Sequence, residues 1–232
     1  GGNATYGVML SLPNSTDKNG PNYITLTDQS SISLAGGTGH TYGVFLRTGY
    51  GSINQSTDIS VAAQSINVTG MGNVSGINVA VGSIYDYKVT VDNSQSVIRA
   101  IRDVGATTTA VVSDVTGINL VSDYSVPSNL YSTIKNIDSI TAINNGNDNA
   151  RVTGIRLFTY SQVLAPMSIN IENANLIYVK QNDANTRGAT GIQARNSNGD
   201  IDINVAPNAG MQVGKIEVIS QKIGFRNIQI SG

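Results

Sequence analysis

Gly154-Ile155-Arg156-Leu157 is one copy of a motif that recurs six times along this chain. Each copy is a short apolar strand that opens with a glycine, and the copies begin at Gly7, Gly43, Gly76, Gly117, Gly154 and Gly191. Successive glycines lie 36, 33, 41, 37 and 37 residues apart. A period in this range is typical of a stacked array, in which no unit buries its own apolar face and neighbouring units supply the missing core.

Two further apolar–polar–apolar triplets follow each glycine-led strand. In the fifth repeat they are Ile169-Asn170-Ile171 and Ile177-Tyr178-Val179. Alternation with a period of two predicts strands that are buried on one side, and the Gly- and Asn-rich connections predict tight corners. We therefore expect an all-β chain: a right-handed parallel β-helix (solenoid) of about six to seven three-stranded rungs, each of about 37 residues. Gly224-Phe225-Arg226 is the expected start of a seventh rung, and the alternative parse divides each repeat into two shorter rungs.

Composition narrows the possible functions. Only 12% of the residues are charged and the net charge is −1, so nothing suggests a nucleic-acid partner or a membrane surface. No apolar run approaches the roughly 20 residues that a membrane-spanning helix needs, so we expect no membrane insertion. The absence of cysteine excludes disulfides and thiolate metal sites. Because the chain starts at Gly1 without an initiating Met, we expect residues 1–232 to be a single domain cut from a longer exported protein.

The glycine-led rungs, the Asn/Ser/Thr-rich outward positions, the absence of cysteine and the low charge resemble the passenger domains of bacterial autotransporter adhesins. The resemblance covers the whole chain at the level of period and composition. It implies an extracellular location on a bacterial cell surface, with no cofactor and no metal. Pectate-lyase-like enzymes and phage tailspikes share the architecture, so the fold by itself leaves the activity open.

Acidic side chains on neighbouring rungs would indicate an enzyme, because one or two rung spacings match the carboxylate separations of glycoside hydrolysis. The outward positions of the glycine-led strand are predicted to be Met9, Phe45, Asn78, Asn119, Arg156 and Gln193. Those of the second strand are predicted to be Thr25, Ser60, Thr90, Lys135, Asn170 and Asp202, and those of the third Ser33, Asn67, Thr141, Tyr178 and Glu217. No two acids follow one another in these series, which favours a protein without enzymatic activity.

A few catalytic candidates remain. His40, the only histidine, lies in a Gly-rich corner, where a structural hydrogen bond is the simplest role. Asp86, Asp123 and Arg156 could converge as an acid–acid–arginine group, although solvated or turn-capping side chains explain them more simply. Arg99 and Arg102 are assigned to a long return connection.

Tyrosines gather in the variable stretch that follows each glycine-led strand, and these stretches should share one edge of the solenoid. The predicted binding residues on this edge are Tyr50, Tyr85, Tyr87, Asp123, Tyr124, Tyr131, Arg156 and Tyr160. Tyrosine combines an apolar face with a hydroxyl and suits contacts with sugars and proteins. The alternative is that the rings fold back and shield the barrel. Met9 and Phe45 form a second apolar pair, covered either by a loop or by a partner.

We therefore expect a non-enzymatic surface adhesin module that binds a host or bacterial glycan, an extracellular-matrix protein or another copy of itself. One alternative is a carbohydrate-active β-helix or phage tailspike fragment that cleaves an acidic polysaccharide. The other is a structural spacer.

Overall fold

The computed structural model of this chain consists of strands and the turns between them. It describes residues 3–12, 22–25, 30–48, 57–81, 87–104, 113–122, 130–146, 150–159, 166–172, 174–182, 188–197, 201–206, 215–220 and 226–231. These residues form no helix, and so none that could cross a membrane. The strands are β1 (Thr5–Leu12), β2 (Asn22–Thr25), β3 (Ser31–Ala35), β4 (Thr41–Thr48), β5 (Thr57–Ala62), β6 (Ser65–Gly70), β7 (Val74–Val81), β8 (Tyr87–Arg102), β9 (Ser113–Ser122), β10 (Leu130–Asn144), β11 (Ala150–Thr159), β12 (Met167–Glu172), β13 (Leu176–Gln181), β14 (Ala189–Asn196), β15 (Ile201–Ala206), β16 (Lys215–Ser220) and β17 (Arg226–Ser231).

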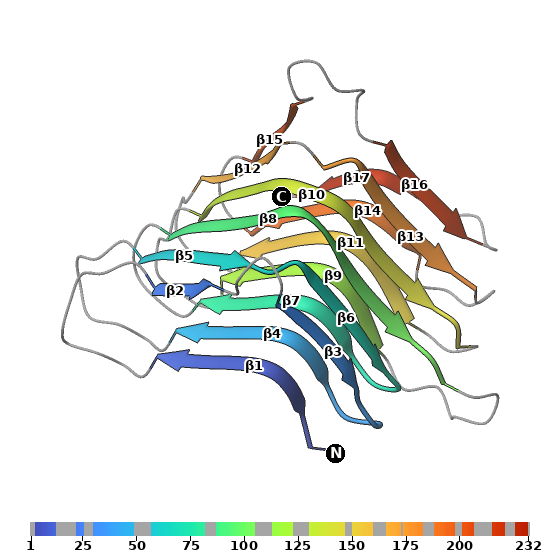
Figure 1. The fold of residues 1–232 in the computed structure, drawn as a ribbon. Helices are drawn as coiled ribbons and strands as arrows, with labels where there is room; N and C mark the ends of the chain where they lie inside the picture. Colours follow the sequence, from blue (N-terminus) through green and yellow to red (C-terminus); the bar gives the residue numbers. More distant parts are fainter. Residues whose placement is uncertain are drawn as a thin grey trace.

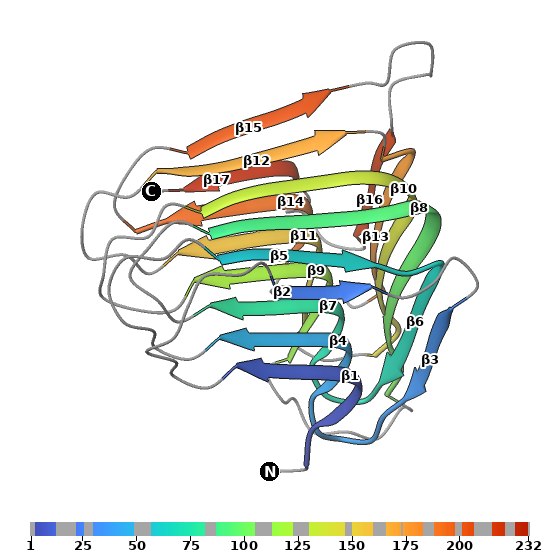
Figure 2. The same cartoon turned by 60° about the vertical axis from the view of Figure 1, so that its left-hand side comes forward.

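Two parallel sheets wind around a common interior (Figures 1 and 2). The first sheet has seven strands, in the order β1-β4-β7-β9-β11-β14-β17. The second has ten, with β15-β12-β10-β8-β5-β2 as its main path, to which β3, β6, β13 and β16 are joined. Between consecutive strands of the first sheet the chain passes through the second sheet. This arrangement confirms the predicted all-β parallel solenoid.

The glycines of the repeat lie where the first sheet approaches an isoleucine column of the second. The residues that follow them pair from rung to rung as Val8, Val44, Ile77, Ile118, Ile155 and Ile192, which is the predicted register. A Cβ atom added to Gly154 would lie 2.5 Å from Cγ2 of Ile177 and 2.6 Å from the carbonyl oxygen of the next glycine. Glycine recurs here because no side chain fits between the two sheets.

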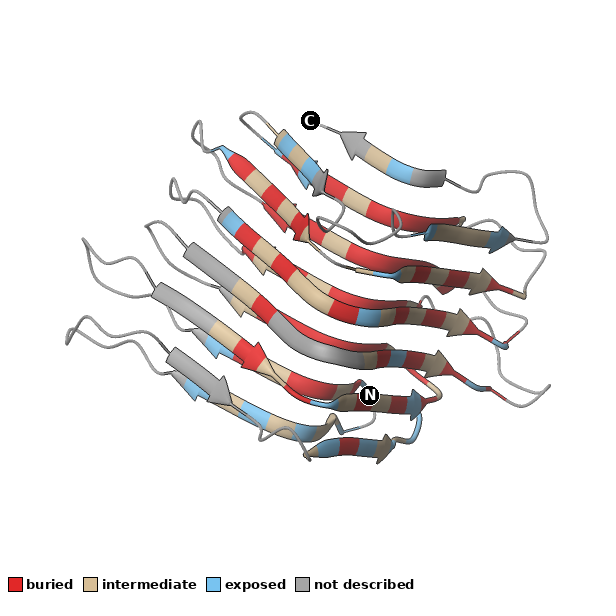
Figure 3. Ribbon diagram, turned by 45° about the horizontal axis from the view of Figure 1, so that its top comes forward, coloured by how far each residue is buried: buried red, intermediate tan, exposed pale blue. Residues whose placement is uncertain are grey.

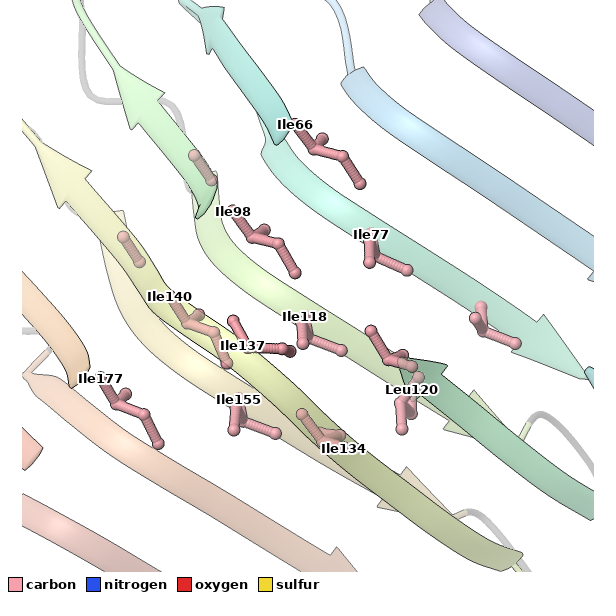
Figure 4. Close-up of a cluster of buried hydrophobic side chains, with 14 of the residues drawn as sticks. Ile66, Ile77, Ile98, Ile118, Leu120, Ile134, Ile137, Ile140, Ile155 and Ile177 are labelled. Carbon is pink, nitrogen blue, oxygen red and sulfur yellow. The ribbon is translucent and has the colours of Figure 1, made fainter. Parts of the chain in front are cut away.

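Aliphatic columns fill the interior. Ile77 and Ile118 of the first sheet and Ile98 and Ile140 of the second are completely buried and lie in one cluster (Figure 4). Along the central strands, buried residues alternate with partly exposed ones (Figure 3). Burying each such side chain stabilises the fold by about 1.5–3 kcal/mol, and branched aliphatics leave no polar atom to satisfy.

The solenoid comprises about three turns, so the predicted six to seven rungs are more than the structure shows. Fewer turns than predicted enclose a core, because a terminal strand has a neighbour on one side only and its inward side chains are incompletely covered. Val8 and Leu10 at one end, and Ile216 and Val218 at the other, pack against the core but stay partly exposed.

The last rung also starts at a different place from the prediction. Strand β17 pairs with β14 so that Ile228 lies beside Ile192, which places Asn227, and not Gly224, at the position of the repeat glycine. Gly224 and Phe225 lie outside the described residues. A glycine alone was therefore a misleading marker of the register.

In the third and fourth repeats, the two predicted short strands are one continuous strand, β8 or β10. Strand β10 bends at Asn136, whose φ is 58°, and its register against β8 shifts on either side of Ile137. Asparagine tolerates this left-handed conformation better than most residues, so the corner is a bulge within a strand. Arg99 and Arg102 consequently lie in β8, and their assignment to a return connection is wrong.

The outward columns of the second sheet differ from the prediction by two residues at several positions. The observed column contains Ser60, Thr90, Thr133, Asn170 and Asn204, so the prediction was wrong for Lys135 and Asp202. At the β2 end, Tyr23 and not Thr25 is the residue that pairs with Ser60. A two-residue shift keeps a side chain on the same face, so alternation cannot detect it. The third column is Ser33, Asn67, Arg99, Thr141, Tyr178 and Glu217, in which Arg99 fills the position left open by the prediction.

Candidate functional site

The predicted binding residues fall in three places. Tyr50, Tyr85, Asp123, Tyr124 and Tyr160 lie outside the described residues, so their place on a binding edge stays a prediction. Tyr87 and Tyr131 lie at the starts of β8 and β10, and Tyr131 is 37% exposed. Tyr131 pairs with Lys88 whereas Tyr87 pairs with Leu130, so the two tyrosines belong to different columns. Arg156 lies on β11, in the other sheet.

Two columns run side by side on the outer face of the first sheet. The first, the hydroxyl column, consists of Tyr6, Tyr42, Ser75, Thr116, Thr153 and Thr190. The second, the amide column, consists of Met9, Phe45, Asn78, Asn119, Arg156, Gln193 and Gln229. The Phe45 ring lies 4.9 Å from the Tyr42 ring and 5.2 Å from the Tyr6 ring, measured between centroids, so both columns face the same side.

Aromatic side chains gather at the β1 end of this face. Tyr6 and Tyr42 are stacked with their centroids 5.6 Å apart, and the His40 ring stacks on Tyr42 at 6.0 Å. We call Tyr6, His40, Tyr42 and Phe45 the aromatic cluster. Burial, and secondarily the neighbouring Tyr6, raises the pKa of Tyr42. Met9, beside this cluster, is 52% exposed, so this end of the face offers an apolar stacking surface.

Polar side chains occupy the middle of the same face. Arg156 Nη1 donates to Asp114 Oδ2 at 3.3 Å, across 42 residues of sequence. Asn119 Nδ2 donates to Asn78 Oδ1 at 2.6 Å, and Gln193 lies next to Arg156 on the following strand. We call Asp114, Asn119, Thr153, Arg156 and Gln193 the polar cluster, and its members come from β9, β11 and β14.

Four oxygen atoms of the polar cluster are buried without a hydrogen-bond partner. They are Asp114 Oδ1, Asn119 Oδ1, Thr153 Oγ1 and Gln193 Oε1. Leaving such an atom unsatisfied costs about 1–3 kcal/mol, so buried polar atoms without partners are rare in native proteins. All four can accept a hydrogen bond, and a ligand that carries hydroxyl groups would supply the missing donors.

Two arginines lie within cation–π distance of one phenyl ring at the edge of the polar cluster. The guanidinium carbons of Arg156 and Arg195 lie 5.3 and 5.2 Å from the centroid of Phe158. Such cation–π contacts orient a guanidinium group over the ring. Among the residues that the structure describes, no group of three or more His, Cys, Asp or Glu side chains is placed to hold a metal ion.

Sequence reasoning predicted the amide column from Met9 to Gln193 correctly but missed the hydroxyl column. It gave no role to Tyr6, Tyr42, Thr153, Phe158 or Arg195. One signal was present in the sequence: the residue before each repeat glycine carries a hydroxyl group in all six repeats. Because the interior needs no hydroxyl, that regularity pointed to the outer face.

No protein-family model matches this chain, and searches against curated proteins and against solved structures give no significant match. The function therefore has to be inferred from the outer face itself.

Proposed function

We propose that this solenoid is a non-enzymatic binding module of an exported bacterial surface protein, and that it binds a glycan on the outer face of its first sheet. We also propose that the solenoid is right-handed and that the module acts as an autotransporter-type adhesin. One observation carries it: the outer face bears both a stacking surface, the aromatic cluster at the β1 and β4 end, and four buried oxygen atoms that lack donors, two or more strands further along the same face.

The chemistry of a glycan matches both the aromatic cluster and the polar cluster. The apolar face of a sugar ring stacks on aromatic side chains, and its hydroxyl groups donate hydrogen bonds. Neighbouring rungs are about 4.8 Å apart, so one extended chain can contact several rungs at once. Because the polar atoms are already fixed by strand pairing, little side-chain entropy is lost on binding.

The predicted tyrosine edge is compatible with this site. In the sequence, Tyr160 directly follows the end of β11, and Tyr50 and Tyr124 are the second residues after the ends of β4 and β9, all strands of the first sheet. Parallel strands end at the same edge of their sheet, so we expect these residues to extend the binding face along that edge.

Thr153→Val provides the sharpest test. The substitution keeps the shape of the side chain, which belongs to a residue that is 1% exposed, and removes a buried hydroxyl oxygen that has no hydrogen-bond partner. We expect the free energy of unfolding to stay equal or to rise by about 1 kcal/mol, because an unsatisfied group disappears. Glycan affinity, measured first on an array and then by titration calorimetry, should fall about threefold to tenfold.

Thr141→Val is the matched control, because Thr141 lies on the outer side of the second sheet. It should leave binding unchanged. Unchanged affinity in Thr153→Val would remove the polar cluster from the site, and the absence of any glycan binding would favour the spacer. Release of new reducing ends from a bound polysaccharide would instead establish the cleaving enzyme.

The triple variant Tyr87→Ala, Tyr124→Ala and Tyr160→Ala tests the predicted edge separately. Loss of binding at an unchanged melting temperature supports the edge. Unchanged binding by the triple variant would indicate that the whole site lies on the outer face of the first sheet.

A further inference from the structure

Charge is distributed unequally between the two sheets. The strands of the first sheet carry no lysine, one acid, Asp114, and five arginines, namely Arg47, Arg151, Arg156, Arg195 and Arg226. The strands of the second sheet carry acids and bases in equal number. A chain of net charge −1 thus concentrates positive charge on the sheet that bears the candidate site.

Two of these arginines are placed to meet a ligand. Arg47 and Arg195 are exposed, and each follows a buried inward residue, so alternation directs both to the outer face. Within the described ranges, no carboxylate pairs with Arg195, whose side chain rests on Phe158. Arginine without lysine indicates planar, bidentate recognition of carboxylate or sulfate, because the guanidinium fork matches those groups and an ammonium does not.

Two contacts hold the guanidinium group of Arg156, which lies near the same phenyl ring as that of Arg195. Asp114 holds one N–H group of Arg156, and the same Phe158 ring lies against its guanidinium carbon. Two cations near one ring repel each other, and an anion bound at Arg195 would reduce that repulsion. The buried acceptor oxygens of Asn119, Thr153 and Gln193 lie beside this pair, and those atoms require donors.

We infer that the ligand is an acidic glycan, whose carboxylate or sulfate group lies on the exposed Arg195 while its hydroxyl groups donate to the buried oxygens of the polar cluster. This inference rests on the proposed function and narrows it. A neutral glycan would leave the arginines unused, and an anion without hydroxyl groups would leave the acceptor oxygens unsatisfied.

The test compares matched ligands on the intact chain. Oligosaccharides that carry uronate groups are assayed beside the same oligosaccharides after reduction of their carboxyl groups, with sulfated oligosaccharides and inorganic polyphosphate as further arms. We expect at least one acidic glycan to bind about tenfold or more tightly than its neutral counterpart, and its affinity to fall as salt is raised.

Variants of Arg195 locate the anion. Arg195→Gln should weaken binding of the acidic glycan about tenfold, and Arg195→Lys should restore only part of it, because lysine supplies the charge but not the fork. Arg99→Gln is the matched control, since Arg99 is an exposed arginine of the second sheet. It should bind like the unmodified chain.

Each of the other possible results refutes one particular part of the inference. Equal binding of the reduced, neutral oligosaccharides refutes the acidic ligand but leaves the proposed glycan function standing. Equal binding of polyphosphate refutes recognition of a sugar. Binding of no oligosaccharide refutes the proposed function itself, and loss of affinity in Arg99→Gln equal to that in Arg195→Gln refutes the placement of the anion.

Discussion

Gly154→Ala tests the physical basis of the repeat. The added methyl group would lie 2.5 Å from Cγ2 of Ile177 and 2.6 Å from the carbonyl oxygen of Gly191. Carbon atoms pack at about 3.5–4.0 Å, so Ile177 would have to retreat by about 1 Å. Ile177 is only 2% exposed, and the Gly191 carbonyl belongs to a strand paired on both sides.

Overpacking a core costs about 1–3 kcal/mol, and we expect the upper end here because a backbone atom must move as well. With a urea m-value of about 3 kcal/mol per M, the unfolding midpoint followed by circular dichroism should fall by about 1 M. Gly37→Ala is the control, since nothing lies within 4 Å of the added atom. Its midpoint should stay constant or rise slightly, because alanine restricts the unfolded chain. Equal midpoints in the two variants would show that close approach does not explain the glycine.

Three further predictions concern the core, a buried cation and an ionisable ring. Ile118→Asp should abolish cooperative unfolding in urea, because it places an unpaired charge at a position of 0% exposure; a stable variant would refute the stacked core. Arg102→Ala should destabilise by about 2–3 kcal/mol, because Arg102 Nε donates to the Gly72 carbonyl at 3.1 Å inside the protein, whereas Arg99→Ala on the same strand should change stability by less than about 0.5 kcal/mol. Alkaline spectrophotometric titration should show a late-titrating phenol that Tyr42→Phe removes, because burial raises the pKa of Tyr42; the associated stability is complete below about pH 10 and is lost as the pH rises through the higher folded-state pKa.

The local sequence pattern was sufficient to predict strand register wherever every rung has the same packing requirement. The glycine-led strands paired in the predicted register from β1 to β14, because a glycine and two inward aliphatic residues are required at the same place in every rung. The register of the strands that follow the variable stretches was harder to predict. There the register depends on the length of the preceding connection, and a two-residue error leaves the alternation intact, as it did at Lys135.

The outer face depended on tertiary structure for a different reason. Asp114 and Arg156 are 42 residues apart and meet because stacking brings β9 beside β11. Tyr42 and Phe45 point to the same side although only two residues, Gly43 and Val44, separate them, because the alternation of faces is interrupted at these two buried residues, where Gly43 lies against the second sheet.

The sequence by itself determined the period, the all-β class and the identity of the inward columns, since these follow from alternation and from the one position where only glycine fits. The tertiary structure decided how many turns enclose a core, where the corner at Asn136 forms and which polar groups meet on the outer face. Those features depend on the registers of strands about 37 residues apart and on which rungs have neighbours on both sides, and no local pattern of residues contains that information.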